Sequence, residues 1–291
     1  AKAAILLGQH IGAPAKPIVA KGDVVKVGTK IAEPGGFVSA AIHSSVSGKV
    51  AKIDTIVDAS GYRRPAIFVD VEGDEWVETI DRTPDLVTLG QRPELTAEDI
   101  VNKVKAAGIV GMGGAGFPTA VKLSPKEPEK MEYVIVNCAE CEPYLTSDYR
   151  KMLEEPERLI GGLKIALSLF DNARGILAVE DNKPECITRL KHLTKDETKI
   201  TVKALKTKYP QGSERQLIFA ATGRAINSSM LPSDVGCIVN NVDTVISIYN
   251  AVMEQKPLMY RIVTVTGDAI ADPRNFRVRI GTLYEGLVEE A

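Results

Sequence analysis

The sequence has no long hydrophobic run: nowhere do 18 apolar residues follow one another, so no membrane-spanning helix is expected. Its first residues, AKAAILLGQHIGAP, lack the charged start and the apolar core of a signal peptide. No excess of one charge is present either, because 36 basic and 38 acidic residues leave a net charge of -2. A nucleic-acid-binding protein needs a basic face, so this class is disfavoured. The 291 residues, 44% of them hydrophobic, predict a globular protein of two or three domains.

Cysteine and histidine are also scarce. Of the four cysteines, Cys138 and Cys141 form a C-x-x-C pair, but no second pair and no nearby histidine completes a zinc site. No closely spaced run of cysteines is present that could hold an iron–sulfur cluster. The sequence therefore predicts reduced thiols, as in a cytoplasmic protein, and no metal site within this chain.

Residues 1–80 carry short apolar runs separated by glycine and aspartate turns, a pattern typical of a small β-sandwich or barrel. The segments GDVVKVGTKI and VSGKV resemble the two half-turns of the biotinyl/lipoyl-like barrel-sandwich domain. In carrier versions of that domain, a lysine on a hairpin before the second segment is acylated. Counting back from Val46, Ser47 and Gly48 places Phe37 there. We therefore expect a non-acylated relative.

A linker-like segment with two prolines (residues 80–95) precedes a region in which helical and strand patterns alternate. Thr96 and Asp99 have the spacing of a helix capping box. Strands are predicted at 133–137, 175–180, 200–205 and 238–239, and helices at 184–193, 213–221 and 242–253. Helical material at 149–170 is expected to be interrupted near Pro156 and Gly161-Gly162. This alternation predicts an α/β layer structure with a mainly parallel sheet.

The last segment, residues 260–291, returns to a β pattern in YRIVTVTGDAI and FRVRIGTLYEGL. Two strands and a turn do not complete a domain. We therefore expect the chain to end within or just after a small β module.

The strongest local signal is the glycine-rich segment GIVGMGGAGFPT, residues 108–119. It contains a formal G-x-G-x-x-G, but it follows a helical pattern and soon meets Pro118, so it is not a Rossmann fingerprint. Four glycines in six residues allow backbone N–H groups to approach a ligand and form an anion-binding nest. Lys122 is placed to neutralise a phosphate. A glycine loop without a ligand is the alternative.

The segment NCAECEP, residues 137–143, directly follows the strand YVIV. In open α/β sheets, ligands bind beyond the carboxyl ends of strands. The amide of Asn137 offers both a donor and an acceptor, which suits the edge of a heterocycle. Glu140 and Glu142 face opposite sides if the backbone stays extended. Two solvated loop carboxylates are the alternative.

Two further segments join a strand end to a helix. In YPQGSE (residues 209–214), Gly212 and Ser213 offer free backbone and a helix start, which favour phosphate. In NNVDT (residues 240–244), a strand end again runs into a helix, and an Asn241 that is no more than a helix cap is the alternative. Taken together, the four polar segments predict one shared crevice, suited to a cofactor that carries its own chemistry.

The segments GMGGAGFPT, NCAECEPY, YPQGSE and NNVDT, in this order, resemble the flavin- and NADH-binding subunit of respiratory complex I. The version NCAECEPYLTSDYR and the opening QHIGAPAKPIV…GFVSAAIHSSVSG are more similar to the RnfC family, the NADH-facing subunit of Rnf ferredoxin:NAD+ oxidoreductases. The resemblance covers nearly the whole chain. It implies a barrel-sandwich hybrid at 1–80, a Rossmann-like α/β core of complex I flavin-subunit type at 81–258, and a truncated β-grasp (SLBB) module at 259–291.

The same resemblance implies facing sites for FMN and NAD(H), with no catalytic side chain because the flavin carries the chemistry. The implied FMN residues are Gly111, Gly113, Gly114, Lys122, Asn137, Glu140, Gly212, Ser213, Asn240, Asn241 and Thr244. The implied NADH residues are Phe117, Glu142, Tyr209 and Glu214. One departure concerns Ala139, which stands where the complex I pattern has an acidic flavin contact.

The implied function is the NADH:FMN electron-transfer module of an ion-translocating ferredoxin:NAD+ oxidoreductase, an oxidoreductase and translocase subunit. RnfC proteins carry two cysteine runs for [4Fe-4S] clusters after the SLBB module, and this chain has neither, so the clusters are expected in a missing C-terminal part. The implied partners are the other subunits of a membrane-bound electron-transport complex and, indirectly, ferredoxin. They would hold the protein peripherally at the cytoplasmic face of the cell membrane.

Two alternatives remain open. One is an RnfC-like cobalamin (corrinoid) reductase, which has the same cofactors and a different electron acceptor. The other is a non-catalytic docking or scaffold subunit, which binds no flavin.

Overall fold

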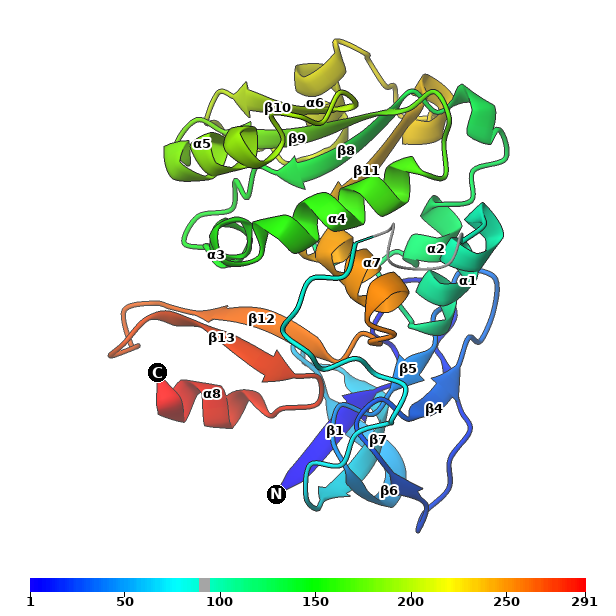
Figure 1. Cartoon of the computed structure of the whole chain (residues 1–291). Coiled ribbons are helices and arrows are strands. Elements are labelled where there is room, and N and C mark those ends of the chain that lie inside the picture. Colours follow the sequence, from blue (N-terminus) through cyan, green and yellow to red (C-terminus); the bar gives the residue numbers. More distant parts are fainter. Residues whose placement is uncertain (89–94) are drawn as a thin grey trace.

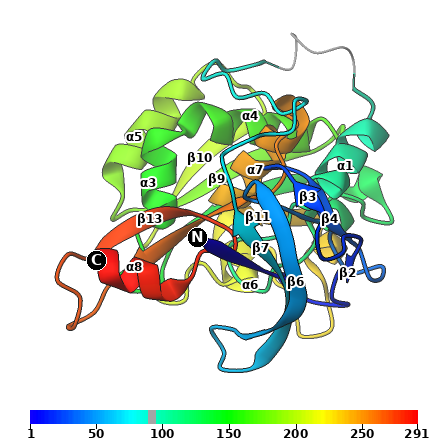
Figure 2. The same cartoon turned by 90° about the horizontal axis from the view of Figure 1, so that it is seen from below.

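The computed structural model describes residues 1–88 and 95–291, so the predicted linker at 80–95 lies partly outside the described residues. Figure 1 shows an α/β part above an N-terminal β part, with a C-terminal hairpin beside the latter. Figure 2 shows from below that the N-terminal strands and the hairpin both lie beneath the α/β part. Among the described residues, no helix has the length and apolar character needed to cross a bilayer.

The N-terminal β part consists of two antiparallel sheets, as expected. One has the order β1-β7-β6-β3 and the other β2-β4-β5. The strands are β1 (Lys2–Leu6), β2 (Lys16–Pro17), β3 (Val24–Val25), β4 (Lys30–Glu33), β5 (Ile42–His43), β6 (Gly48–Val57) and β7 (Arg63–Val71). Their buried faces meet in one core that includes Ile5, Ile31 and Ile67. Phe37 lies between β4 and β5 with 85% of its surface exposed.

The α/β part contains a four-stranded sheet of order β10-β9-β8-β11, and every pair of neighbours is parallel. Its strands are β8 (Tyr133–Cys138), β9 (Arg174–Glu180), β10 (Ile200–Leu205) and β11 (Cys237–Asn241). Side chains alternate between the faces of a strand. On β8, Val134 and Val136 therefore join the larger core, while Ile135 joins the smaller one on the other face.

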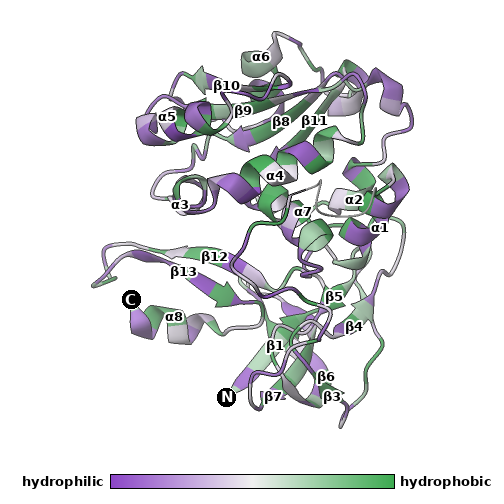
Figure 3. Ribbon diagram, in the orientation of Figure 1, coloured by the Kyte–Doolittle hydropathy of each residue, from purple (hydrophilic) through white to green (hydrophobic). Residues whose placement is uncertain are grey.

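Helices cover both faces of this sheet. The larger core contains residues of α1 (Ala97–Ala106), α3 (Ser147–Glu154), α4 (Pro156–Leu167), α5 (Pro184–Leu193) and α7 (Val242–Met253). The smaller core is closed by α6 (Glu214–Thr222). Figure 3 shows hydrophobic colour on the central strands, while α4 alternates between hydrophobic and hydrophilic colour. Short helices also belong to this part: α2 (Thr119–Lys122), η2 (Pro128–Lys130) and η3 (Pro232–Val235).

Several helix ends follow the local sequence. The predicted capping box is confirmed: Thr96 Oγ1 accepts from the Asp99 N–H at 3.1 Å, and the Asp99 carboxylate accepts from the Thr96 N–H at 2.9 Å. Pro184 opens α5. Gly223 ends α6 with a φ of 78°, a left-handed conformation that glycine adopts without strain.

The predicted interruption at Gly161-Gly162 is wrong, since α4 runs unbroken through both residues. Their function is close packing. A Cβ on Gly162 would lie 2.0 Å from the carbonyl oxygen of Val245, and one on Gly161 would lie 2.7 Å from the ring of Tyr249. The missing side chains allow α7 to approach α4, which outweighs the helix-weakening tendency of glycine.

The C-terminal segment contains an antiparallel hairpin of β12 (Tyr260–Val265) and β13 (Arg274–Arg279). The expectation of strand structure through LYEGL is wrong, because α8 (Tyr284–Glu290) occupies it. Leu283 precedes this helix in an extended conformation, and Leu287 is its one buried residue. Hydrogen bonds from Ser45 Oγ to the Ile280 carbonyl and from the Ala4 N–H to the Gly281 carbonyl hold this segment against the N-terminal β part.

Candidate cofactor-binding site

The carboxyl ends of the parallel strands bring the predicted segments together. Asn137, the next-to-last residue of β8, lies beside Asn241, the last residue of β11, and the two are direct partners in the ladder. Their side chains lie at the edge of the sheet where α/β proteins bind ligands.

The glycine loop lies against the end of β11. It closes as a narrow hairpin in which the Gly111 N–H donates to the Phe117 carbonyl at 2.8 Å. The Met112 N–H donates to Thr244 Oγ1 at 2.9 Å, and a Cβ on Gly113 would lie 3.0 Å from that of Asn241. The loop follows α1 and not a strand, in agreement with the rejection of a Rossmann fingerprint. Two predicted segments are therefore one structural unit.

The end of β8 contacts the YPQGSE segment in the same way. Asn137 Nδ2 donates to the Gly212 carbonyl at 2.8 Å, and its Oδ1 accepts from the Ala139 N–H at 3.2 Å. The Gly212 N–H in turn donates to Cys141 Sγ at 3.2 Å. Asn137 thus fixes the position of Gly212.

The expected direction of the Glu140 side chain depended on an extended backbone, and the backbone at Glu140 is not extended. Its φ is 46°, and the carboxylate turns onto the start of α3. There it accepts from Ser147 Oγ at 3.1 Å and from the N–H groups of Asp148 and Tyr149 at 2.7 and 2.9 Å. Free N–H groups and the positive end of the helix dipole attract a carboxylate, and the N-cap residue Thr146 makes no side-chain cap bond of its own to the described residues.

The remaining predicted residues are placed as follows. Lys122 Nζ donates to the Val239 carbonyl at 2.7 Å and lies 3.6 Å from Glu214 Oε1. Ser213 stands at the N-cap position of α6, and Asn241 caps α7 with its Oδ1. Glu142 and Tyr209 are exposed neighbours, and Glu142 raises the pKa of Tyr209. Phe117 is half-buried.

Free donors at this edge fit a phosphate-bearing cofactor. The backbone N–H groups of residues 113–116 make no hydrogen bond to any part of the chain that the structure describes. Asn240 is 4% exposed, and its Nδ2 also has no acceptor there. Buried donors are almost always paired, and a ligand rich in acceptors satisfies such groups. No atom of the described residues lies within 4 Å of a Cβ on Gly114, so that side of the loop is open.

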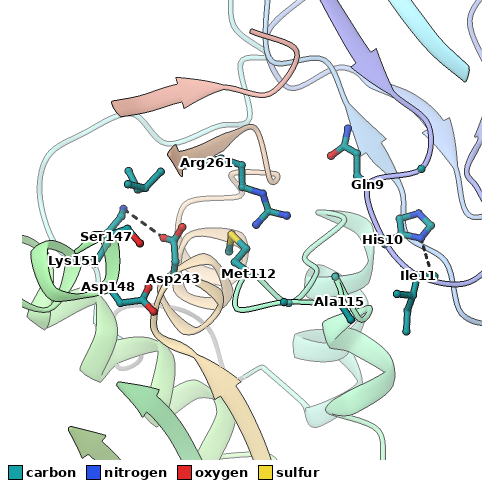
Figure 4. A pocket seen from close by; sticks show the side chains of 15 residues that line it. Gln9, His10, Ile11, Met112, Ala115, Ser147, Asp148, Lys151, Asp243 and Arg261 are labelled. Carbon is teal, nitrogen blue, oxygen red and sulfur yellow. Dashed lines mark hydrogen bonds and ion pairs between the residues drawn. The ribbon is translucent and has the colours of Figure 1, made fainter. Parts of the chain in front are cut away.

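A cavity of about 390 Å³ opens on this side of the loop (Figure 4). It lies between the glycine loop, the first turns of α3 and α7, the N-terminal loop and β12. Its lining residues are Gly8, Gln9, His10, Ile11, Gly111, Met112, Gly114, Ala115, Gly116, Ser147, Asp148, Lys151, Asp243, Arg261 and Ile262. Of this set, sequence reasoning singled out only Gly111, Gly114 and Gly116. Asp148 and Asp243 lie within the motifs named above, while Arg261 carries no local signal.

Charges in the cavity are largely compensated. Lys151 pairs with Glu155 at 2.6 Å and with Asp243 at 3.5 Å. Burial raises the pKa of Asp148 to about 8, with smaller contributions from Glu140 and Asp243. Asn241 Nδ2 donates to Asp148 Oδ2 at 2.6 Å. Near pH 7, Asp148 is therefore mostly protonated.

The cysteines do not form a reactive pair. All four are free thiols, and burial raises the pKa of Cys138 well above its usual range and that of Cys186 to about 11. No group of three or more potential metal ligands gathers within the described part of the chain.

The chain is similar to known proteins over nearly its whole length. Residues 104–250 match the family described as the Nuo51 FMN-binding domain, and residues 1–74 match the RnfC barrel sandwich hybrid domain. The proton-translocating ferredoxin:NAD(+) oxidoreductase complex of Clostridium ljungdahlii has a subunit that is 44% identical over 99% of this chain. The corresponding subunit of the Na(+)-translocating complex from Acetobacterium woodii is 42% identical over 98% of it. This chain spans 62% and 63% of those two relatives.

A solved structure shares the fold. The NAD+-reducing [NiFe]-hydrogenase in its air-oxidized state matches 67% of this chain and 38% of its own chain, with a TM-score of 0.58 and 23% identity. At this identity the likeness concerns the fold alone.

Proposed function

The chain belongs to the RnfC family, and from this membership we propose that it is the NADH:FMN electron-transfer module of an ion-translocating ferredoxin:NAD+ oxidoreductase complex. One observation carries the proposal. The glycine loop, with N–H groups that no described residue accepts from, rests on the NNVDT segment beside an open cavity. This arrangement supports a flavin phosphate site at the carboxyl edge of a parallel sheet.

The residues divide into those that bind and those that position. Gly111, Gly113 and Gly114 present backbone to the FMN phosphate and ribityl chain. Asn241 and Thr244 hold the loop in place through Gly113 and the Met112 N–H. When bound, FMN accepts a hydride from NADH and passes electrons on singly.

The second group supports the sheet edge around the ring. Asn137 orients Gly212 and the start of α6, and Glu140 anchors α3. Lys122 ties α2 to β11 and to Glu214. The buried Asn240 amide offers the flavin its Nδ2 donor, which finds no acceptor among the described residues.

The nicotinamide side belongs to residues outside the cavity. Glu142 and Tyr209 lie together on exposed loops after β8 and β10, and we propose that they contact NADH with Glu214 and Phe117. The residues of this chain would thus orient the two ring systems against each other.

We extend the proposal to the rest of the molecule. Residues 1–80, 81–258 and 259–291 form three domains, and the hairpin with α8 belongs to an SLBB β-grasp module. The [4Fe-4S] clusters lie in the part of the relatives that this chain does not span. The partners are the other subunits of the complex, with ferredoxin as an indirect partner, and they hold the protein at the cytoplasmic face of the membrane.

The test is an anaerobic visible spectrum of the protein reconstituted with FMN, before and after NADH is added. Flavin bands near ~370 and ~450 nm that bleach with NADH are the expected result. A protein that binds no flavin contradicts the proposal and favours a scaffold subunit. Bound FMN that NADH does not bleach contradicts the nicotinamide half.

A further inference from the structure

One positive charge in the cavity has no partner in the described part of the chain. Arg261 extends from β12 toward Met112 and the glycine loop (Figure 4). Its guanidinium group forms no hydrogen bond or ion pair with residues 1–88 and 95–291. Other half-buried arginines are paired: Arg158 lies 2.7 Å from Glu254 and Arg224 lies 2.6 Å from Glu132. A buried cation without a counter-charge is costly, which indicates an anion supplied from outside the chain.

The neighbouring carboxylates do not fill this role. Burial lowers the pKa of Arg261, and only the more distant charge of Asp243 acts against this among the described groups. Asp243 is itself paired with Lys151, as the dashed line in Figure 4 shows. Asp148 is mostly protonated near pH 7 and accepts from Asn241.

The opposite wall of the cavity offers hydrogen-bond donors. The glycine loop contributes the N–H groups of residues 113–116, which no described residue accepts from, and the guanidinium of Arg261 faces the same space. A planar guanidinium and a nest of N–H groups together match the oxygens of a phosphate.

Lys122 is the cation that the sequence predicts to neutralise the phosphate, but in the structure its ammonium group has other partners. Its ammonium group donates to the Val239 carbonyl, lies near Glu214 and does not line the cavity. The two candidates therefore make different predictions.

We propose that Arg261 binds the phosphate monoester of FMN from the side of the C-terminal hairpin, opposite the glycine loop, and so selects FMN over riboflavin. This inference rests on the proposed function, which supplies the flavin. It makes β12, far from the flavin motifs in sequence, part of the cofactor site.

The experiment titrates the full chain with FMN and with riboflavin and follows the quenching of flavin fluorescence. Wild-type protein is expected to prefer FMN. Arg261→Met is expected to raise the Kd for FMN by at least about tenfold, because a charge-assisted hydrogen bond is lost. The Kd for riboflavin, which has no phosphate, is expected to stay within about twofold of the wild-type value. Arg261→Lys keeps the charge without the planar fork and is expected to recover part of the preference.

Two matched variants complete the design. Arg277→Met removes the same charge from β13, where Arg277 stacks on Tyr260 outside this cavity, and should leave both Kd values unchanged. Lys122→Met tests the other cation. Far-UV circular dichroism of each variant checks that it is folded, and if Arg261→Met is not, Arg261→Gln and Arg261→Lys carry the comparison.

The outcomes separate the two proposals. If wild-type protein binds neither flavin, the proposed function fails and the role of Arg261 fails with it. If FMN is bound and the FMN-to-riboflavin ratio survives Arg261→Met, or collapses only in Lys122→Met, Arg261 is not the phosphate ligand and the proposed function stands. ADP-ribose, the part of NADH without nicotinamide, is titrated against the same proteins. If Arg261→Met weakens the binding of ADP-ribose and leaves that of FMN unchanged, Arg261 binds a phosphate of the dinucleotide and the inference is likewise overturned.

Discussion

Replacing Asp148 with asparagine is expected to make the protein progressively more stable than wild type as the pH rises. Asp148 is half-buried beside Glu140 and Asp243, and its pKa is raised from 3.8 to about 8, chiefly by desolvation. The folded state therefore keeps a proton that the unfolded state releases above pH 4. Stability from this group is complete below pH 4 and is lost as the pH rises through 8.

The magnitude follows from the pKa difference. Each pH unit within this window removes about 1.4 kcal/mol from the free energy of unfolding, or about 4 kcal/mol between pH 5 and pH 8. Asp148→Asn imitates the protonated carboxyl, because its amide oxygen still accepts from Asn241 Nδ2. The buried His43, with a pKa lowered to about 4, destabilises both proteins equally in acid and cancels in the comparison.

The assay is urea unfolding of both proteins at pH 5, 6, 7 and 8. Far-UV circular dichroism is the suitable probe, because the single tryptophan, Trp76, pairs with Val27 of the N-terminal β part and reports that region. A difference between the two proteins that stays constant across the series would mean that Asp148 is ionised throughout. The argument from burial would then be wrong.

Three further changes test other parts of the structure. Gly162→Ala places a Cβ 2.0 Å from the Val245 carbonyl oxygen and should lower the free energy of unfolding by about 1–3 kcal/mol, whereas Gly286→Ala, with open space around it, should not lower it. Glu140→Ala removes the cap of α3 and should cost about 1–2 kcal/mol in the same urea assay; an unchanged midpoint would contradict the capping role. Glu142→Ala should raise the Kd for NADH more than that for FMN in fluorescence titrations, and equal effects would mean that the two faces are misassigned.

The sequence by itself determined the features that depend on neighbouring residues. The buried runs YVIVN and GILAVE predicted two central strands, and Pro184 and Gly223 marked a helix start and a helix end. Thr96 with Asp99 predicted a cap that the structure contains. These features are readable because propensity, capping and periodicity operate within a few residues of the chain. Four polar segments in order, with the version NCAECEPYLTSDYR and the N-terminal opening, were sufficient to indicate the RnfC family.

The tertiary structure decided what depends on residues far apart in the chain. Gly161 and Gly162 predicted a helix break, but the approach of α7 makes them contact residues of an intact helix. The backbone at Glu140 is not extended, because the carboxylate of Glu140 accepts hydrogen bonds from the free N–H groups at the start of α3. Arg261 lines the same cavity as the glycine loop although about 150 residues separate them in the sequence, so only the folded chain brings them together. Packing and long-range charge compensation set these outcomes, and no local pattern encodes them.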